Sequence, residues 1–554
     1  MSNSPNGGHA SIAARFVAAL LLFSGPALGQ DPGQDAGKGP GKGKEPDNGD
    51  DPSIAFFKMG EIPKLRIELD DDAVEQLRTS PREWAPCRIR ENEKQIFDGV
   101  SIKLKGAAGS FRDFDEKPAL TIRMDKVDAA QRFHGLEKFH LNNSVQDGTF
   151  LHEFLGSELF RAAGVLAPRI THAHVWLNER DVGLYVLKEG FDRTLLRRGF
   201  EDASGNLYDG GFCQDVDADL EKDGGKGSDD HGDLKALLDA CREPDVVKRW
   251  PRLEALLDVD RFITFMAMEF MLGHWDGYCI NRNNYRLYFD PTTGKAYFLP
   301  HGMDQLFEDP DASILDHPPA IVATAVMRNP EWRSRYRRRI GELLPLFDSG
   351  KLSRRVDEVS KRIAKTLQSV DRERAHNHDG RVSDLKDRLD GREKSLKAQK
   401  ARPEPKPLVF TPDTPVKLDR WRRMSECRDA KLEEDRVGVE RVYRIACGRS
   451  HVCIASWRKG VLLARGRYRF QAAMSAKDVA PLEEQDAPGI GGGLRIGGSS
   501  RENKLVGTSG SKTIEFEFTV EEEVGDVELI VELRASRGSI QLRADSLKLT
   551  RLAD

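Results

Sequence analysis

The stretch that decides the interpretation of this chain is His274-Trp275-Asp276-Gly277-Tyr278-Cys279-Ile280-Asn281. It places an aspartate five positions before an asparagine, and Asn283-Asn284-Tyr285 follows directly. A carboxylate can accept a proton, and an amide oxygen can bind a hard cation. The alternative is a polar turn between an apolar helix expected over 262–272 and a buried strand, because this spacing also occurs by chance.

The same spacing occurs in the protein-kinase catalytic loop, H-R-D-x-x-x-x-N, whose aspartate takes the proton of the attacking hydroxyl while the asparagine holds a metal ion. Further along, after a strand expected over 285–289, comes Pro300-His301-Gly302-Met303-Asp304. Asp304 stands where a second metal-binding carboxylate should follow. Phosphoryl transfer needs positioned charge rather than a covalent nucleophile. We therefore expect Asp276 as the catalytic base, with Asn281 and Asp304 as metal ligands.

Length and composition limit the other possibilities. A chain of 554 residues is too long for one hydrophobic core, so two or three domains are expected. The net charge of −4 argues against general nucleic-acid binding. The seven cysteines include no C-x-x-C pair, and a zinc site is not expected. Cys447 and Cys453 are the nearest candidates for a disulfide, but scattered small apolar residues are the preferred interpretation.

The N-terminus has the features of an export signal. Arg15 precedes the apolar run 16–23, and Ala27-Leu28-Gly29 offers small residues before a cut at Gln30. Residues 1–29 are thus predicted to be a signal peptide, with an uncleaved anchor as the alternative. Residues 30–53 are predicted to be a disordered linker, and no later segment is apolar enough to span a membrane. The mature protein is expected to be secreted, periplasmic or in the cell envelope.

Alternating apolar residues predict strands over 64–69, 100–105 and 119–124, the last two forming a hairpin around the small-residue loop 106–110. A helix is expected from Thr149 to about Ala163, ended by Gly164. Two further strands, 172–177 and 183–188, are joined by the tight turn 178–181. The element order of this part is therefore strand, loop, strand, helix, strand, strand, and then a helical region that contains the aspartate loop.

Small lobes of protein kinases have a similar order of elements. A loop covers the phosphates, a lysine on a strand holds them, and a glutamate on a helix orients the lysine. Lys105 or Lys117 could be the lysine, and Glu153 the glutamate. Solvated surface lysines are the alternative, as is a glutamate that only favours the helix dipole. Gly106 and Gly109 could bring backbone amides close to an anion, although no G-x-G-x-x-G is present.

With these features together, residues about 60 to 345 resemble the spore-coat CotH kinase family, whose members have an atypical protein-kinase-like fold. The resemblance implies binding of ATP with Mg²⁺ or Mn²⁺ and phosphorylation of hydroxyls in secreted or coat proteins. It also implies that Glu189 lies at or near the interlobe hinge, close to the adenine. The matching landmarks are Lys105–Phe111, Lys138–Asn143, Leu151–Leu155, Gly183–Glu189, Gly205–Tyr208, His274–Tyr278, Asn283–Tyr288 and Pro300–Phe307.

One position departs from the family pattern. Members commonly read P-W-D-x-D where this chain has Pro300-His301-Gly302-Met303-Asp304, so glycine replaces the first aspartate. If that carboxylate is the main metal ligand, the chain is a degenerate kinase. If Asp304 is the ligand, activity survives.

Two segments outside these motifs are rich in charge. The acidic run 215–221 suggests calcium, but an EF-hand's mid-loop glycine and closing glutamate are absent, and a solvated loop is preferred. Residues 352–400 read as charged helices that pack against the large lobe or each other. Residues 411–415 look like a linker.

The C-terminal third has repeated short strands separated by turn-forming residues, which is typical of a β-sandwich. It resembles, at the level of fold, the jelly-roll modules that bind carbohydrate in exported proteins. Trp457, Tyr468 and Phe470 could stack on a sugar, or they could lie in the core. The expected strands are 452–457, 460–464, 466–470, 493–496, 513–520, 527–533 and 546–552.

The expected architecture is thus an α+β kinase-like domain over 54–345, charged helices and a linker over 346–410, and an all-β sandwich over 411–554. The expected activity is transfer of the ATP γ-phosphate to Ser or Thr of an envelope or secreted protein, with polysaccharide as a further partner. The alternative is an inactive kinase-like adhesion or assembly protein. A carbohydrate hydrolase would need paired carboxylates in a sugar cleft, and no such pair stands out.

Overall fold

The computed structural model describes residues 51–553 apart from 59, 108, 317, 404–405, 412–413, 426, 428, 439, 450–452, 483–490 and 500–502. The predicted signal peptide and residues 30–50 of the predicted linker lie outside this range. The last residues of that linker prediction are helical, because α1 spans Pro52–Phe56 with Asp51 as its N-cap. No helix in the described ranges is both long and apolar enough to cross a bilayer.

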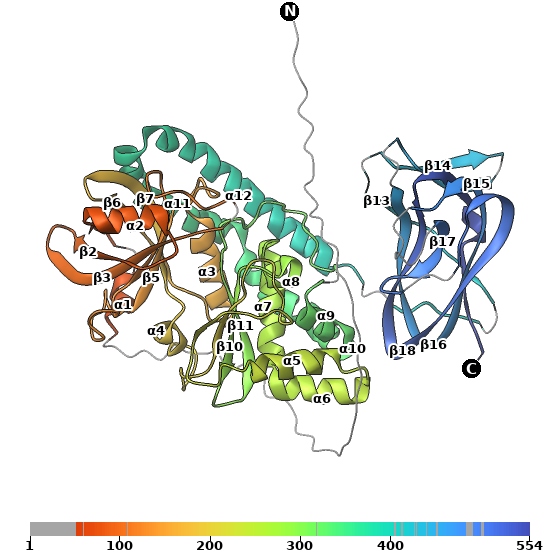
Figure 1. Ribbon diagram of the computed structural model, residues 1–554, viewed down its shortest axis with the longest axis horizontal. Coiled ribbons are helices and arrows are strands. Elements are labelled where there is room, and N and C mark those ends of the chain that lie inside the picture. Colours follow the sequence, from red (N-terminus) through yellow and green to blue (C-terminus); the bar gives the residue numbers. More distant parts are fainter. Residues whose placement is uncertain are drawn as a thin grey trace, which may run out of the picture. The chain divides into compact units, whose positions relative to one another are not determined.

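The first part of the described chain is a closed, seven-stranded β-barrel (Figure 1). Strand order is β1-β2-β3-β4-β5-β7-β6, and β6 closes the barrel by pairing in parallel with β1. The predicted β3–β4 hairpin is confirmed. Alternate side chains fill the interior, so Leu65, Ile67 and Ile102 have no exposed surface. The elements are β1 (Lys64–Glu68), α2 (Asp71–Thr79), β2 (Ala85–Glu91), β3 (Gln95–Lys105), β4 (Ala119–Arg123), β5 (Lys138–Asn142), β6 (Ile170–Leu177) and β7 (Arg180–Glu189).

A single helix, α3 (His152–Ala162), is inserted between β5 and β6. It begins three residues later than predicted, because the Asp147 carboxylate accepts hydrogen bonds from the backbone amides of Thr149 and His152 and holds the preceding residues in a turn. Its buried apolar face belongs to a core shared with the helical part that follows. This placement sets Glu153, in the first turn, inside the protein rather than at its surface.

A helical part with a small antiparallel sheet, ordered β11-β10-β8-β9, follows the barrel. Its central helix α7 is buried on nearly every side, is capped by Asp258, and ends at Gly273 with a left-handed φ of 66°. The elements are α4 (Arg193–Leu196), β8 (Leu207–Asp209), β9 (Lys222–Gly224), α5 (Gly232–Arg242), α6 (Val246–Leu256), α7 (Val259–Leu272), α8 (Tyr278–Asn281), β10 (Tyr285–Asp290), β11 (Lys295–Pro300), α9 (Ile321–Arg328), α10 (Pro330–Leu343) and η1 (Leu344–Phe347).

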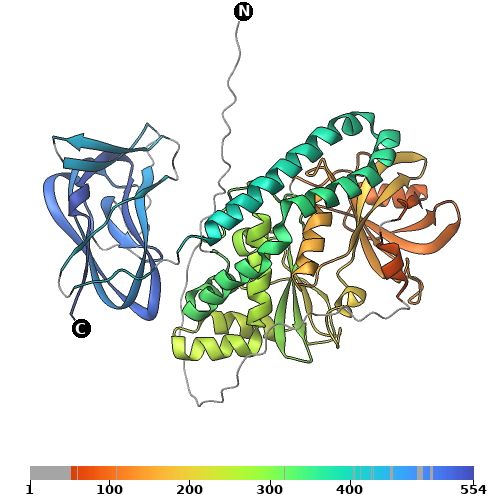
Figure 2. The same cartoon turned by 180° about the vertical axis from the view of Figure 1, so that it is seen from behind.

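The charged segment after 346 forms two long helices, α11 (Ser349–Val370) and α12 (Arg372–Lys400), which lie side by side in both Figure 1 and Figure 2. Leu352, Val356, Val359, Ile363 and Leu367 of α11 recur every three or four residues and are buried in the core that contains α3 and α7. The prediction that these helices pack against each other and against the large lobe is confirmed, and their charges lie on the remaining faces.

The C-terminal part is all-β, as predicted, but its strands are not all short. β16 (Cys453–Ala480) runs through three predicted strands, and β18 (Gly507–Ala535) runs through two. Glycines that read as turns instead lie inside bent strands, where the β16–β18 pairing is irregular between Ala464 and Gly466. The other strands are β12 (Val416–Lys417), β13 (Arg422–Ser425), β14 (Lys431–Val437), β15 (Glu440–Ala446), β17 (Gly491–Ile496), β19 (Arg537–Arg543) and β20 (Lys548–Arg551), with η2 (Ala544–Ser546). A jelly-roll order of these strands stays a prediction.

The three aromatic residues singled out for sugar stacking lie in the core of this part. Trp457, Tyr468 and Phe470 are each 1% exposed or less. The Trp457 indole donates to the Arg444 carbonyl, and the Tyr468 hydroxyl donates to the Ala464 carbonyl at 2.6 Å. The alternative that they are core residues is therefore correct, and the stacking hypothesis for them is wrong.

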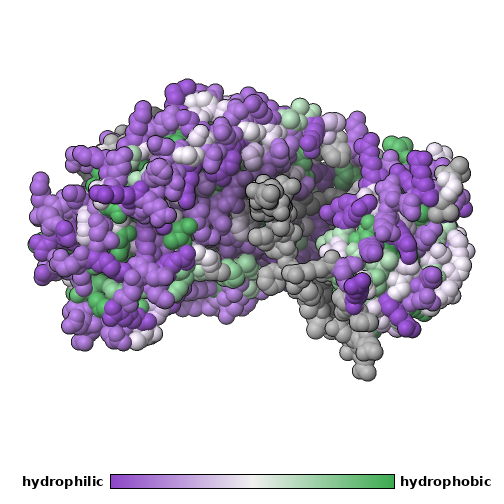
Figure 3. Space-filling view, turned by 90° about the horizontal axis from the view of Figure 1, so that it is seen from above, coloured by the Kyte–Doolittle hydropathy of each residue, from purple (hydrophilic) through white to green (hydrophobic). Residues whose placement is uncertain are grey.

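All seven cysteines are free, including Cys447 and Cys453. The face drawn in Figure 3 is predominantly hydrophilic, with hydrophobic residues in small separate groups. Few large apolar side chains are strongly exposed among the described residues, so those that are, including Phe212 and Trp275, stand out.

Candidate active site

A buried ion pair joins the barrel to α3. Lys188 on β7 and Glu153 on α3 are 1% and 2% exposed, and the Lys188 Nζ lies 2.9 Å from the Glu153 Oε1. The Asn142 amide donates to the other carboxylate oxygen, at 2.5 Å. Burial acts to raise the pKa of Glu153, but Lys188, Lys105 and these hydrogen bonds hold it below its ordinary value. The carboxylate is thus charged and fixed in one orientation.

Lys105, at the end of β3, lies in the same cluster. Its Nζ donates to the Asn142 Oδ1 at 2.6 Å, so one asparagine joins the lysine to the glutamate. Burial and the neighbouring Lys188 lower the pKa of Lys105 to about 7, against the attraction of Glu153 and Asp304. Two lysine amines therefore lie close together with one carboxylate between them, which favours an additional anion.

The residues after β11 complete this cluster. The Lys188 Nζ is 3.3 Å from the His301 Nδ1, and burial together with Lys188 and Arg286 lowers the pKa of His301 well below its ordinary value. His301 is therefore neutral and accepts from Lys188. Burial and the nearby Glu153 raise the pKa of Asp304 to about 6. The two carboxylates compete for the same cations, which is a setting in which a bound divalent ion is favourable.

The aspartate loop forms the second half of the site. The Asp276 carboxylate accepts hydrogen bonds from the side-chain amides of Asn281, Asn283 and Asn284, and the Asn284 bond measures 2.7 Å. A buried carboxylate on α7, Glu269, holds the loop backbone by accepting from the amides of Tyr278 and Cys279 at 2.9 and 2.8 Å. Asp276 is therefore an ordered, partly exposed acceptor at the start of α8.

The structure explains why position 302 is a glycine. Its φ is +50°, and a Cβ atom there would lie 2.1 Å from the Asn284 Oδ1. The same Asn284 donates to Asp276. The side chain of Asn284 thus occupies the space beside Gly302, and an aspartate at 302 would require this part of the loop to rearrange.

Lys117 lies outside this cluster. Its Nζ donates to the Leu184 carbonyl at 2.8 Å and lies over the rings of Phe150 and Tyr185. Burial and Arg374 lower the pKa of Lys117 to about 7. The prediction that Lys117 pairs with Glu153 is wrong, because Lys188 fills that position.

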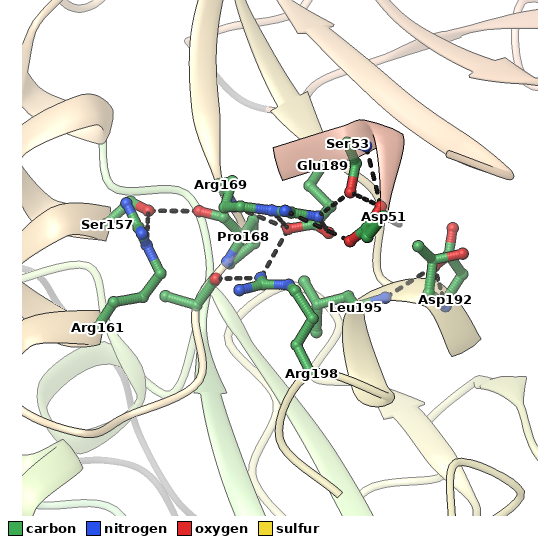
Figure 4. A network of polar contacts seen from close by, with 12 residues as sticks. Asp51, Ser53, Ser157, Arg161, Pro168, Arg169, Glu189, Asp192, Leu195 and Arg198 are labelled. Atoms are coloured by element: carbon green, nitrogen blue, oxygen red, sulfur yellow. Dashed lines mark hydrogen bonds and ion pairs between the residues drawn. The ribbon is translucent and has the colours of Figure 1, made fainter. Parts of the chain in front are cut away.

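Glu189 follows Lys188 on β7 and points to the opposite face of the strand. Its fully buried carboxylate accepts from the Arg169 Nη2 at 2.8 Å, from the Arg169 backbone amide at 2.9 Å and from the Arg198 Nη2 at 2.7 Å. Figure 4 shows both arginines directed at this carboxylate. The carboxylate of Glu189 is therefore engaged in a structural network with the two arginines, and its position near the interlobe hinge, close to the adenine, stays a prediction.

The acidic run at 215–221 is only partly a solvated loop. Asp215 is buried and accepts from the Tyr278 hydroxyl and the Ile321 amide, both at 2.9 Å. It therefore fastens the insertion to α8 and α9. Asp217 pairs with Arg242 and Asp219 with His231, so these residues do not form a calcium loop.

The donor set fits a divalent metal that is shared with phosphates. Within the described ranges no group of three or more His, Cys, Asp or Glu residues could hold a metal alone. Mg²⁺ is commonly bound by one or two carboxylates and completed by substrate phosphates and water. Asn281 donates through its amide nitrogen, which leaves its oxygen for a cation, and Asp304 offers a carboxylate. Asn281 and Asp304 are thus suitable ligands.

Comparison with known proteins bears on this geometry. Residues 102–396, more than half of the chain, match the family described as CotH kinase protein. The chain belongs to the CotH kinase family. This family is kinase-like and implies the use of ATP and a divalent metal in general. The matched range includes α11 and nearly all of α12.

Curated relatives include the invasin CotH2 of Rhizopus delemar, 23% identical over 334 residues, and the inner spore coat protein H of Bacillus subtilis, 23% identical over 240 residues. The alignments cover 53% and 40% of this chain and 55% and 61% of those relatives. The chain therefore spans little more than half the length of these two relatives.

Two solved structures are also similar. The Helicobacter pylori proinflammatory kinase CtkA is 11% identical, with a TM-score of 0.26, and the match covers 48% of this chain and 94% of that one. TmCBM61 in complex with β-1,4-galactotriose is 17% identical, with a TM-score of 0.18, and the match covers 24% and 90%. At these scores neither likeness supports a conclusion about function.

Sequence reasoning found Asp276, Asn281, Asp304, Glu153 and Lys105 but did not single out Lys188. The signal was a lysine directly after the apolar run 184–187 of a strand, which places the amine inside the protein rather than in solvent. Asn142 and His301 also escaped notice, because neither residue type indicates by itself that it will bind a lysine.

Proposed function

We propose that the protein is an exported CotH-type protein kinase that transfers the γ-phosphate of ATP to Ser or Thr of envelope or secreted proteins. The observation that carries the proposal is the Lys188–Glu153 pair, buried at 2.9 Å and connected through Asn142 to Lys105. A buried lysine oriented by a helix glutamate is what a kinase needs to hold the nucleotide phosphates. A purely structural ion pair would not need a second lysine amine beside it.

The residues divide the chemistry between them. Lys188 and Lys105 bind and orient the phosphates, with Glu153 and Asn142 fixing their amines. Asp276 takes the proton of the acceptor hydroxyl, whose oxygen forms the new bond to the γ-phosphorus as ADP leaves. A divalent ion held by Asn281 and Asp304 would neutralise phosphate charge. The three asparagine amides keep Asp276 in position for the proton transfer.

The other parts of the chain fit this proposal. A signal peptide at 1–29 would carry the kinase out of the cytoplasm, where envelope or secreted acceptors are found. The β-sandwich would hold the enzyme to polysaccharide or to an envelope partner. With Trp457, Tyr468 and Phe470 in the core, such binding would use polar side chains rather than those rings.

A second candidate is a kinase-like adhesion or assembly protein without activity. Gly302 favours it, because the carboxylate common in the family is missing there and Asn284 occupies the adjacent space. Under this alternative the ordered Asp276 loop would serve only to maintain the fold.

The deciding experiment measures phosphate transfer from labelled ATP, with Mg²⁺ or Mn²⁺, for the wild type and Asp276→Ala. We expect incorporation into the protein itself or an added protein acceptor, and its loss in the variant. ATP binding without transfer by either protein would favour the inactive alternative. Absence of both binding and transfer would reject the kinase proposal.

A further inference from the structure

Arg282 immediately follows the predicted metal ligand Asn281 and is partly buried. Its backbone amide donates to the Tyr278 carbonyl, but its guanidinium makes no hydrogen bond or ion pair with any described residue. The Nε atom is fully buried and unsatisfied. Buried polar groups in native proteins nearly always have a partner, so an arginine without one points to an absent ligand.

The backbone of Arg282 strengthens this point. It lies in the left-handed region, with φ 54° and ψ 41°, at the C-terminus of α8. Glycine adopts this conformation without steric cost, whereas an arginine is disfavoured there. A costly residue beside a catalytic loop is more readily explained by what its side chain binds than by the fold.

The neighbours of Arg282 show on which side of Asp276 its side chain lies. The Asn281 amide lies 3.6 Å from the Cys213 sulfur, and burial and Asp276 raise the pKa of the Cys213 thiol while Arg282 opposes them. Arg282, Cys213 and Asp276 are therefore neighbours. Arg286, in contrast, is the arginine that acts on His301 and Lys105, on the phosphate side.

Two exposed aromatic residues flank the same neighbourhood. Trp275, directly before Asp276, is 42% exposed, and Phe212, directly before Cys213, is 59% exposed. Neither ring has an aromatic partner among the described residues. Large aromatic side chains left in solvent beside an arginine are typical of a surface that binds a polypeptide.

We propose that Arg282, Trp275 and Phe212 form the acceptor-binding surface and select a polypeptide with an acidic side chain close to its Ser or Thr. The inference rests on the proposed kinase function and adds the class of acceptor. The guanidinium has no partner among the described residues, while two acidic residues of the adjoining insertion are already paired, Asp217 with Arg242 and Asp219 with His231. The aromatic rings contact the apolar part of the peptide.

The test compares two Ser peptides that differ only in having Glu or Gln beside the serine. For the wild type we expect the Glu peptide to have a kcat/KM about tenfold higher or more, as expected for a charge-assisted hydrogen bond. Arg282→Gly should remove this preference, leave the KM for ATP unchanged and preserve folding, because glycine relieves the left-handed backbone. Arg282→Lys should restore part of the preference.

Arg420→Gly is the matched control, because Arg420 is an exposed arginine with φ 55° in the C-terminal part and should leave the preference intact. Trp275→Ala and Phe212→Ala should lower kcat/KM for both peptides by the same factor. Equal kcat/KM for the two peptides with the wild type would overturn the inference.

Binding of both peptides, labelled and measured by fluorescence anisotropy without ATP, separates this inference from the proposed function. A Glu preference in binding that disappears in Arg282→Gly would support the surface even if no peptide were phosphorylated. Transfer without any Glu preference in either assay would retain the kinase and reject the surface.

Discussion

Two buried clusters of charge lie on opposite faces of β7, and they differ in how completely their groups are paired. Around Glu189, two arginines supply several hydrogen bonds to one carboxylate. Around Lys188, two lysine amines share Glu153 and Asn142, with a neutral histidine beside them. Each charged group of the Glu189 cluster contacts a group of opposite charge, and Asp51 lies a further 3.8 Å from Arg169, whereas the Lys105 amine directly contacts only the neutral Asn142 among the described residues. A buried ion pair is therefore best assigned a binding role when it leaves charge unmatched.

The largest effect on stability should come from opening the complete cluster. Glu189→Gln removes the buried carboxylate that Arg169 and Arg198 share, so the free energy of unfolding should fall by about 3–5 kcal/mol. Urea denaturation of the purified variant measures this. Glu158→Gln is the control, because its pair with Arg355 is partly exposed and should contribute at most about 1 kcal/mol. If Glu189→Gln lowered the free energy of unfolding by no more than the control does, the Glu189 cluster would not have the structural role assigned to it.

The largest effect on chemistry should come from the incomplete cluster. Lys188→Met removes the amine that holds the phosphates and should lower kcat/KM for phosphate transfer by about 10²–10³-fold. Lys117→Met is matched to it, because the Lys117 amine donates to the Leu184 carbonyl inside the same part of the chain yet lies outside the cluster. Its transfer rate per folded molecule should stay near that of the wild type. If the two variants lost activity equally, Lys188 would have no special role.

A pH effect on stability should arise next to the Glu189 cluster. Burial, with Glu189 nearby, raises the pKa of Asp192 from 3.8 to about 7. Between these values the folded state holds a proton that the unfolded state has lost, so this contribution is complete below pH 3.8 and disappears as the pH rises through 7. Asp192→Asn should be more stable than the wild type at pH 8, by about 2 kcal/mol after allowance for partial exposure.

Thermal or urea unfolding at pH 5 and pH 8 tests this prediction. The Asn side chain can still accept the Thr194 amide that Asp192 caps at 2.8 Å. Asp245→Asn changes another N-cap aspartate, at the exposed start of α6, and should show no gain at pH 8. A gain of equal size in both variants would point to a general effect of charge.

The smallest effect should come from restoring the residue common in the family. Gly302→Asp should lower stability by about 1–2 kcal/mol and should not raise transfer, because its Cβ meets Asn284 and its φ is left-handed. Gly302→Ala separates the steric part from the charge. Higher kcat with Gly302→Asp than with the wild type would show instead that the carboxylate is a missing ligand.

Sequence patterns predicted much of the fold and part of the site. Period-two and period-3.6 patterns located β1, β3, β4, β6, β7, α3, α7 and the helices after 349. They failed at β16 and β18, because a glycine that bends a strand gives the same local signal as one that reverses the chain. They offered Lys105 or Lys117 as the strand lysine and did not single out Lys188, because spacing along the chain does not show which amine lies across from α3.

The sequence by itself determined the chemistry that is available. Asp276, Asn281, Asp304 and Glu153 carry the carboxylate and amide groups that the proposed chemistry uses, and their order along the chain, with the surrounding motifs, indicated the family. Only the tertiary structure decided which groups meet. Lys188 and Glu189 are adjacent in sequence, but alternation along β7 sends one to Glu153 and the other to Arg169 and Arg198. Partners brought together by barrel closure and by the position of α3 are long-range contacts, and local pattern contains no information about them.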